Sequence, residues 1–136
     1  MPFLFGNCEC WFDMPKKAVN LVTSITRTFY RSLFFAPKGT PIFCFYWDTG
    51  SLLEENHVIL KKMLFFHYVA KLPDQCLSKE VFNLQREDSS LFGLVSECKG
   101  YMELLNIKSD PVSFSKYQWR NLLRNRIHAK NKSDLL

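Results

Sequence analysis

The stretch SLLEENHVILKKMLFFHYVA, residues 51–70, decides the fold. Its apolar residues recur at the three- and four-residue spacing of one broad helix face: Ile59, Leu60, Met63, Leu64, Phe66, Tyr68 and Ala70. Such a broad apolar surface is typical of a helix at the centre of a bundle. Ser51 and Glu54 form the S-x-x-E pattern of a capping box, so we expect Ser51 to cap this helix.

The residues before this stretch predict a basic amphipathic helix over about 14–34, with Asp13 as its cap and Pro15 in its first turn. One face is apolar and predicted to point inward, with Ala18, Val22, Ile25, Phe29 and Leu33. The other carries Lys16, Asn20, Ser24, Arg27 and Arg31. A short apolar run follows at 42–47. Gly50 is suited to the left-handed end of a helix, which favours a helix there.

The residues after the central stretch predict shorter helices. Asp74 is expected to cap one helix, with Leu77, Val81 and Leu84 inward. A further apolar stripe runs over 91–105, with Gly93 and Gly100 allowing close helix contact or weakening the helix. Ser115-x-x-Gln118 is a second capping box and marks the start of the last helix. The residues of this helix that are predicted to point inward are Trp119, Leu122, Leu123 and Ile127. Its apolar pattern decays after about residue 125.

These patterns predict an all-α protein, a small bundle of five to six helices in a single domain over 1–136. The basic helix spans about 14–34, the central helices about 51–85 and the C-terminal helices about 91–131. At 47% hydrophobic residues, with 13 Phe, the chain is too apolar for a disordered tail. No run of about 18 uncharged apolar residues predicts a membrane-spanning helix, and the start does not resemble a signal peptide, so no membrane partner is expected.

The net charge of +5 is unevenly distributed: +3 over 1–40, −3 over 41–110 and +5 over 111–136. Basic ends on an acidic body favour contact with a polyanion at the ends. Ordinary solvated helix faces remain the alternative. Aromatic residues amid cations can stack on bases, and Tyr117 and Trp119, next to Lys116, Arg120 and Arg124, are the best candidates. Their helical spacing favours a core role instead.

No motif predicts catalysis, a cofactor or a metal ion. A glycine-rich phosphate loop, HExxH, GxSxG and paired catalytic carboxylates are absent from the sequence. Cys8 and Cys10 are too close together for the usual zinc pair. The odd number of cysteines, five, rules out a fully paired disulfide framework and predicts an intracellular reducing compartment, cytoplasm or nucleus. His67 is better explained as a packed residue than as a catalytic base.

Several short motifs occur in a specific order along nearly the whole chain. They are Asn7-Cys-Glu-Cys-Trp11, Lys16-Lys17, Arg31-Ser-Leu33, Thr40-Pro-Ile42, Tyr46-Trp-Asp-Thr-Gly50, Lys62-Met-Leu-Phe-Phe-His67, Leu72-Pro-Asp74, Leu77-Ser-Lys-Glu-Val81 with Gln85, Phe92-Gly-Leu-Val-Ser-Glu97 and Lys116-x-x-Trp119. This order resembles the region just after the polymerase core in the reverse-transcriptase protein of LINE-type (non-LTR) retrotransposons.

The resemblance implies a helical, thumb-like connecting region that grips the primer–template duplex. It also implies a truncated copy, since the palm aspartates that bind Mg²⁺ in that family lie upstream of this region and its zinc knuckle is missing. We therefore expect no enzyme activity and at most sequence-independent binding to an RNA or DNA duplex backbone. The predicted contacts are Lys16, Lys17, Arg27, Arg31, Lys116, Arg120 and Arg124. The alternative is a helical protein-interaction module, with self-association or a protein partner on a former interdomain surface.

Overall fold

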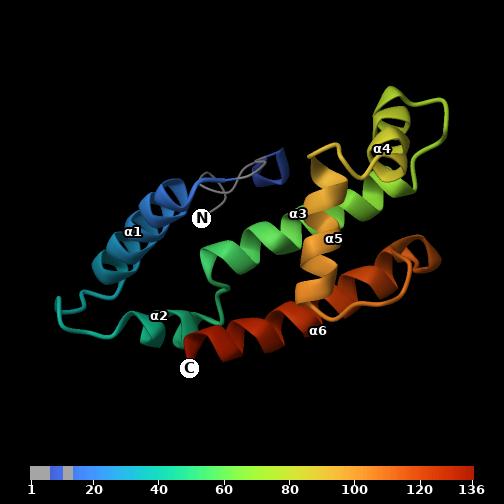
Figure 1. The fold of residues 1–136 in the computed structure, drawn as a ribbon. Coiled ribbons are helices and arrows are strands. Elements are labelled where there is room, and N and C mark those ends of the chain that lie inside the picture. Colours follow the sequence, from blue (N-terminus) through green and yellow to red (C-terminus); the bar gives the residue numbers. More distant parts are fainter. Residues whose placement is uncertain (1–6, 11–13) are drawn as a thin grey trace.

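A computed structural model describes residues 7–10 and 14–136, and every regular element in these residues is helical, which confirms the predicted class (Figure 1). The elements are η1 (Cys8–Cys10), α1 (Lys16–Leu33), α2 (Ile42–Thr49), α3 (Glu54–Ala70), α4 (Leu77–Glu87), α5 (Leu94–Leu104), η2 (Pro111–Ser113) and α6 (Lys116–Leu135), where η marks a short 3-10 helix. Within the same residues, no helix has both the length and the apolar character to cross a membrane.

The centre of the molecule is α3, as the broad apolar pattern predicted. It contacts α1, α4, α5, α6 and both short 3-10 helices. In Figure 1 α6 runs alongside α3 in the opposite direction, α5 crosses the pair, and α1 and α2 lie at the N-terminal end of α3. The antiparallel pairing places the C-terminal end of α3 beside the start of α6.

The main core lies between α3, α4, α5 and α6. Its buried residues are Ile59, Met63, Phe66, Val69, Ala70, Phe82, Leu94, Val95, Cys98, Leu105, Ile107, Trp119, Leu123 and Ile127. Trp119, Leu123 and Ile127 are all 0% exposed, which confirms the predicted inward face of the last helix. A separate small cluster of Tyr30, Phe45 and Tyr46 joins α1 to α2.

The start of α3 differs from the prediction. The helix begins at Glu54, and Ser51 does not cap it. The Ser51 hydroxyl oxygen instead accepts a hydrogen bond from the Tyr30 hydroxyl at 2.8 Å. At the N-cap position, the backbone N–H of Leu53 donates to the side-chain oxygen of Asn131 at 2.8 Å. Because Asn131 belongs to α6, the partner of this helix start comes from a distant part of the chain and no local pattern could reveal it.

The end of α6 also differs from the prediction. Helix continues to Leu135 although the apolar pattern decays after residue 125, because its last turns are held by polar contacts. The buried Asn56 amide donates at 3.0 Å to both Asn131 and Asp134. Lys130 donates to Asn56 at 3.0 Å and to Asp134 at 2.5 Å. Burial would raise the pKa of Asp134, but the hydrogen bonds from Lys130 and Asn56 outweigh it and lower that pKa.

The predicted inward face of α1 is wrong in part. Ile25, Phe29 and Leu33 are 45–54% exposed, whereas Thr26 and Tyr30 are buried. The periodicity found the apolar arc of the helix correctly, but the helix is rotated so that a neighbouring arc meets α3. Asp13, the predicted cap, lies outside the described residues. Pro15 occupies the N-cap position itself and not the first turn.

The arc that α1 buries contacts both α2 and the start of α3, since Tyr30 packs against Phe45 and Tyr46. Thr23 donates to the Glu54 carboxylate at 3.5 Å, and Tyr46 of α2 donates to the same carboxylate. Glu54 is only 4% exposed, so these donors satisfy a carboxylate that would otherwise be costly to bury.

The helix predicted at 42–47 is confirmed as α2. It ends at Gly50, whose φ of 63° is the left-handed conformation expected there. For α4, the predicted cap at Asp74 is wrong, since Cys76 holds the N-cap position.

The inward face predicted for α4 is wrong as well. Leu77, Val81 and Leu84 are exposed, and Phe82 enters the core instead. The next helix, α5, begins at Leu94, with Gly93 at its N-cap position.

Asn131 gives a direct test of the polar end of α6. Asn131→Ala removes the acceptor for Leu53 and Asn56, and unsatisfied buried donors cost about 1–3 kcal/mol each. We expect the free energy of unfolding, measured by urea titration with circular dichroism, to fall by at least about 1 kcal/mol. Lys132→Ala, at an exposed position one residue on, is the control and should change it by less than about 0.5 kcal/mol. Equal losses in the free energy of unfolding for the two variants would contradict the role of Asn131 as a cap for α3.

Candidate nucleic-acid interface

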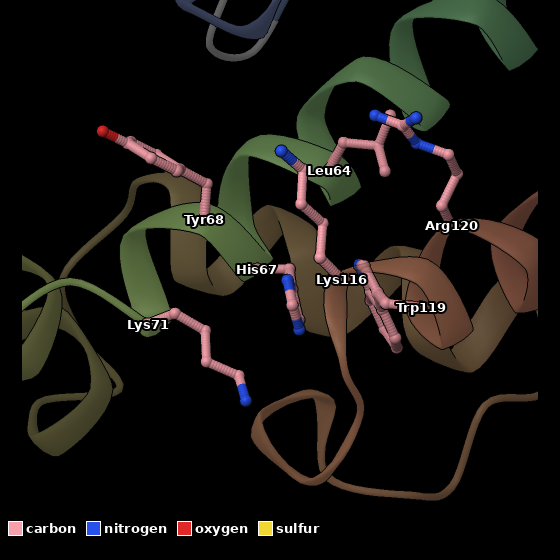
Figure 2. Close-up of a pocket in the computed structure, with 7 residues that line it drawn as sticks. All are labelled: Leu64, His67, Tyr68, Lys71, Lys116, Trp119 and Arg120. Carbon is pink, nitrogen blue, oxygen red and sulfur yellow. The ribbon is translucent and has the colours of Figure 1, made fainter.

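A pocket of about 300 Å³ lies where the C-terminal turns of α3 meet the first turn of α6 (Figure 2). It is lined by Leu64, His67, Tyr68, Lys71, Lys116, Trp119 and Arg120. Three of these seven side chains are cationic and none is acidic. The lining thus combines positive charge with aromatic surface, the two features that bind nucleic acids.

The first turn of α6 is fixed by the capping box that the sequence predicted. The Ser115 hydroxyl accepts from the Gln118 backbone N–H at 3.3 Å, and the Gln118 side chain accepts from the Ser115 N–H at 3.0 Å. The box satisfies two free donors at the helix start and holds Lys116 and Arg120 on an ordered turn.

Trp119 anchors this turn to α3. It is 0% exposed, and its indole N–H donates to the Met63 carbonyl at 3.1 Å. The core role that the helical spacing favoured is therefore confirmed for Trp119, and base stacking, the alternative, is excluded because neither face of its ring reaches the surface. Tyr117, the other candidate, is 74% exposed but does not line the pocket.

His67 forms the floor of the pocket together with Trp119. The two rings stack with centroids 5.7 Å apart at 16°. The His67 Nε2 lies 3.0 Å from the carbonyl oxygen of Phe114, to which it donates as the N–H tautomer. This arrangement confirms the prediction that His67 is a packed, hydrogen-bonded residue.

The three cations reach the pocket from two helices. In Figure 2 Lys116 and Arg120 extend from α6 in the same direction, across α3, and Lys71 points the other way from the end of α3. All three are exposed, and none forms an ion pair with another described residue. Their mutual repulsion is uncompensated, so an anion bound here would be attracted by all three.

The cations predicted from the sequence do not form one surface. Lys116 and Arg120 share the pocket, whereas Arg124 is exposed farther along α6. On α1, Lys16, Lys17 and Arg27 are exposed and Arg31 is half-buried, with no hydrogen-bond partner for its buried Nε among the described residues. Figure 1 shows α1 at the end of α3 opposite the start of α6.

Lys71 was missed by the sequence analysis. It follows the last residue of α3 and precedes Leu72-Pro73, where the helix is broken. A lysine at this position is common, because a positive charge interacts favourably with the C-terminal end of the helix dipole. Only the antiparallel pairing of α3 with α6 brings it near Lys116.

Metal-ligand clusters and the buried cysteine thiols were the remaining groups to consider in the described part of the chain. No group of three or more His, Cys, Asp or Glu residues there could hold a metal ion. Burial raises the pKa of the Cys98 thiol, and burial together with Glu9 raises that of Cys8. Both thiols are therefore neutral at pH 7 and poor nucleophiles.

Comparison with protein-family models, curated proteins and solved structures found no match. What the pocket binds is therefore inferred from its geometry and chemistry.

The anchoring role of Trp119 is testable. Trp119→Phe removes the donor to Met63 and leaves a void beside His67, so we expect a loss of about 2–4 kcal/mol in the free energy of unfolding. Tyr117→Phe, two residues away and exposed, should change it by less than about 0.5 kcal/mol. Urea titration measures both. A Trp119→Phe variant as stable as the wild type would show that the indole does not join α3 to α6.

Proposed function

We propose that this protein binds the backbone of nucleic acids, without sequence preference and without catalysis, at the pocket between α3 and α6. The observation that carries the proposal is that three cations, Lys71, Lys116 and Arg120, line one pocket that has no acidic lining residue. Arginine can bind phosphate through two parallel hydrogen bonds, and lysine acts as a point charge. No pair of Asn, Gln or Arg side chains is arranged as a reader of base edges among the lining residues, which favours backbone contact.

The motif order described above supports a more specific origin. We propose that the chain is a remnant of the thumb-like region of a LINE-type reverse transcriptase. A thumb holds a primer–template through its backbone, which agrees with a cationic pocket on an all-helical scaffold. The prediction of a reducing compartment, cytoplasm or nucleus, belongs to the same proposal, because a nucleic-acid partner would be met there.

The salt dependence of binding tests this proposal. Fluorescence anisotropy with a labelled, primed RNA–DNA duplex should give a slope of log K against log salt of about −2 to −3, as three phosphate contacts imply. Arg120→Gln removes one contact and should weaken binding and reduce the slope by about 1. Circular dichroism on the same samples checks that each variant is folded.

Two variants serve as matched controls. Lys132→Gln lies on α6 outside the pocket and should bind as the wild type does. Arg27→Gln lies on the predicted stripe of α1, and a larger loss there than at Arg120 would move the interface to α1. No binding at low salt by a folded wild-type protein would refute nucleic-acid binding altogether.

A second candidate function, self-association, is favoured by the apolar surface of α1. Leu21, Ile25, Phe29 and Leu33 share one side of the helix at four-residue spacing and are 45–60% exposed; Phe34 and Phe35 follow. At roughly 100 Å² of uncovered surface each, these six approach the 800 Å² or so per partner of a standard interface. Lys16, Arg27 and Arg31 lie on the opposite arc of the helix, and Lys17 is one turn before Leu21 at the end of the apolar row. Two copies that meet here therefore keep most of the positive charge of α1 outside the contact. We propose that a second copy of the chain binds to this apolar side of α1.

Sedimentation velocity over a concentration series tests this candidate. The wild type should dimerise, and Ile25→Glu with Phe29→Glu should remain monomeric because a charge in an apolar interface is costly. Leu84→Glu, on the exposed side of α4, is the matched control and should dimerise as the wild type does. A wild-type protein that stays monomeric at all concentrations would eliminate self-association.

A further inference from the structure

The remaining aromatic residue of the pocket, Tyr68, is placed differently from Trp119 and His67. Those two are buried, whereas Tyr68 is 59% exposed on the outer side of α3. Figure 2 shows its ring projecting away from the Trp119 and His67 pair, on the side toward which Lys116 extends. The pocket thus has a cationic rim and, beside it, one aromatic ring open to a ligand.

The Tyr68 ring is held in place before any ligand arrives. It stacks against Phe65 with centroids 6.3 Å apart at 26°, and Phe65 in turn packs against the main core. An aromatic side chain fixed in this way loses little conformational entropy when a second ring stacks on its free face.

We propose that Tyr68 is a stacking platform for an unpaired base and that the ligand of the pocket is single-stranded nucleic acid. The inference rests on the proposed function, since the same pocket supplies the backbone contacts. A base against Tyr68 leaves its phosphates on the side toward which Lys116 and Arg120 extend. In a duplex the bases are already paired and stacked, so a duplex could use only the cations.

The other exposed aromatic residues do not share this arrangement. Tyr117 is exposed on α6 but outside the pocket, and Trp47 lies on α2, at the other end of the molecule. Phe92 is exposed between α4 and α5 and does not line the pocket. Among the described residues, Tyr68 is the exposed ring that lines a pocket together with all three cations.

The experiment compares two probes by fluorescence anisotropy: a short oligothymidylate, and an abasic deoxyribose-phosphate oligomer of the same length. Wild-type protein should bind the oligothymidylate more tightly, by about 5- to 150-fold if one base stacks. Tyr68→Ala should remove that preference, bind the abasic probe as the wild type does, and keep the salt slope. Tyr68→Phe retains the ring and should behave as the wild type.

Phe92→Ala is the matched control, because it removes an aromatic side chain of similar exposure, 65%, away from the pocket. It should leave the preference for the oligothymidylate intact. If Tyr68→Ala does not fold, an oligonucleotide containing 2-aminopurine reports on the wild-type protein directly, since stacking quenches its fluorescence and backbone binding alone does not.

The outcomes separate the inference from the function on which it rests. Equal wild-type affinity for the two probes, or unquenched 2-aminopurine in the bound state, overturns stacking while backbone binding stands. Unchanged preference in Tyr68→Ala also overturns it. No binding of either probe at low salt by a protein that binds the primed duplex overturns the stacking platform alone, and no binding of the duplex as well overturns the proposed nucleic-acid function.

Discussion

The burial of Trp119 against α3 is the contact on which the rest of the structure depends. The indole is 0% exposed, donates to the Met63 carbonyl and stacks on His67, so it fixes both the position and the rotation of α6 on α3. Lys116 is one turn before it and Arg120 directly follows it. Once the large ring is buried, these two cations are forced to the edge of the helix that faces the end of α3. The pocket is thus a consequence of core packing.

The charged residues at the two ends of the α3 and α6 pair differ: those at one end form ion pairs, and those at the other end do not. At the N-terminal end of α3, Lys130 is paired with Asp134, and deeper in the fold Lys62 pairs with Glu97 at 2.6 Å. At the other end, Lys71, Lys116 and Arg120 surround a pocket without an acidic lining residue. Paired charges are explained by the fold itself, since buried ions require partners. Gathered, unpaired charges cost stability through repulsion and are better explained by an anionic ligand.

The helices themselves could be predicted from the sequence, because apolar periodicity, the Ser115 capping box and the left-handed Gly50 are local signals. The errors share one physical cause. Periodicity identifies the apolar arc of α1 but not which arc meets a neighbour, and the arc that is buried carries Thr23, which donates to Glu54, and Tyr30, which packs on α2. Asn131 caps α3 across 78 residues of sequence. Lys71 joins the site only through tertiary pairing. Each of these depends on a contact between distant segments.

The proposed pocket is small for a nucleic-acid interface, and this bears on how it could work. Three phosphate contacts imply an affinity that falls about 20- to 40-fold between 50 and 200 mM salt, so one pocket grips weakly under physiological conditions. A dimer would carry two pockets, and the second would engage at the raised effective concentration that a linked site provides. The apolar face of α1 is at the opposite end of α3 from the pocket, so dimerisation there leaves both pockets open. Self-association would therefore strengthen the proposed binding.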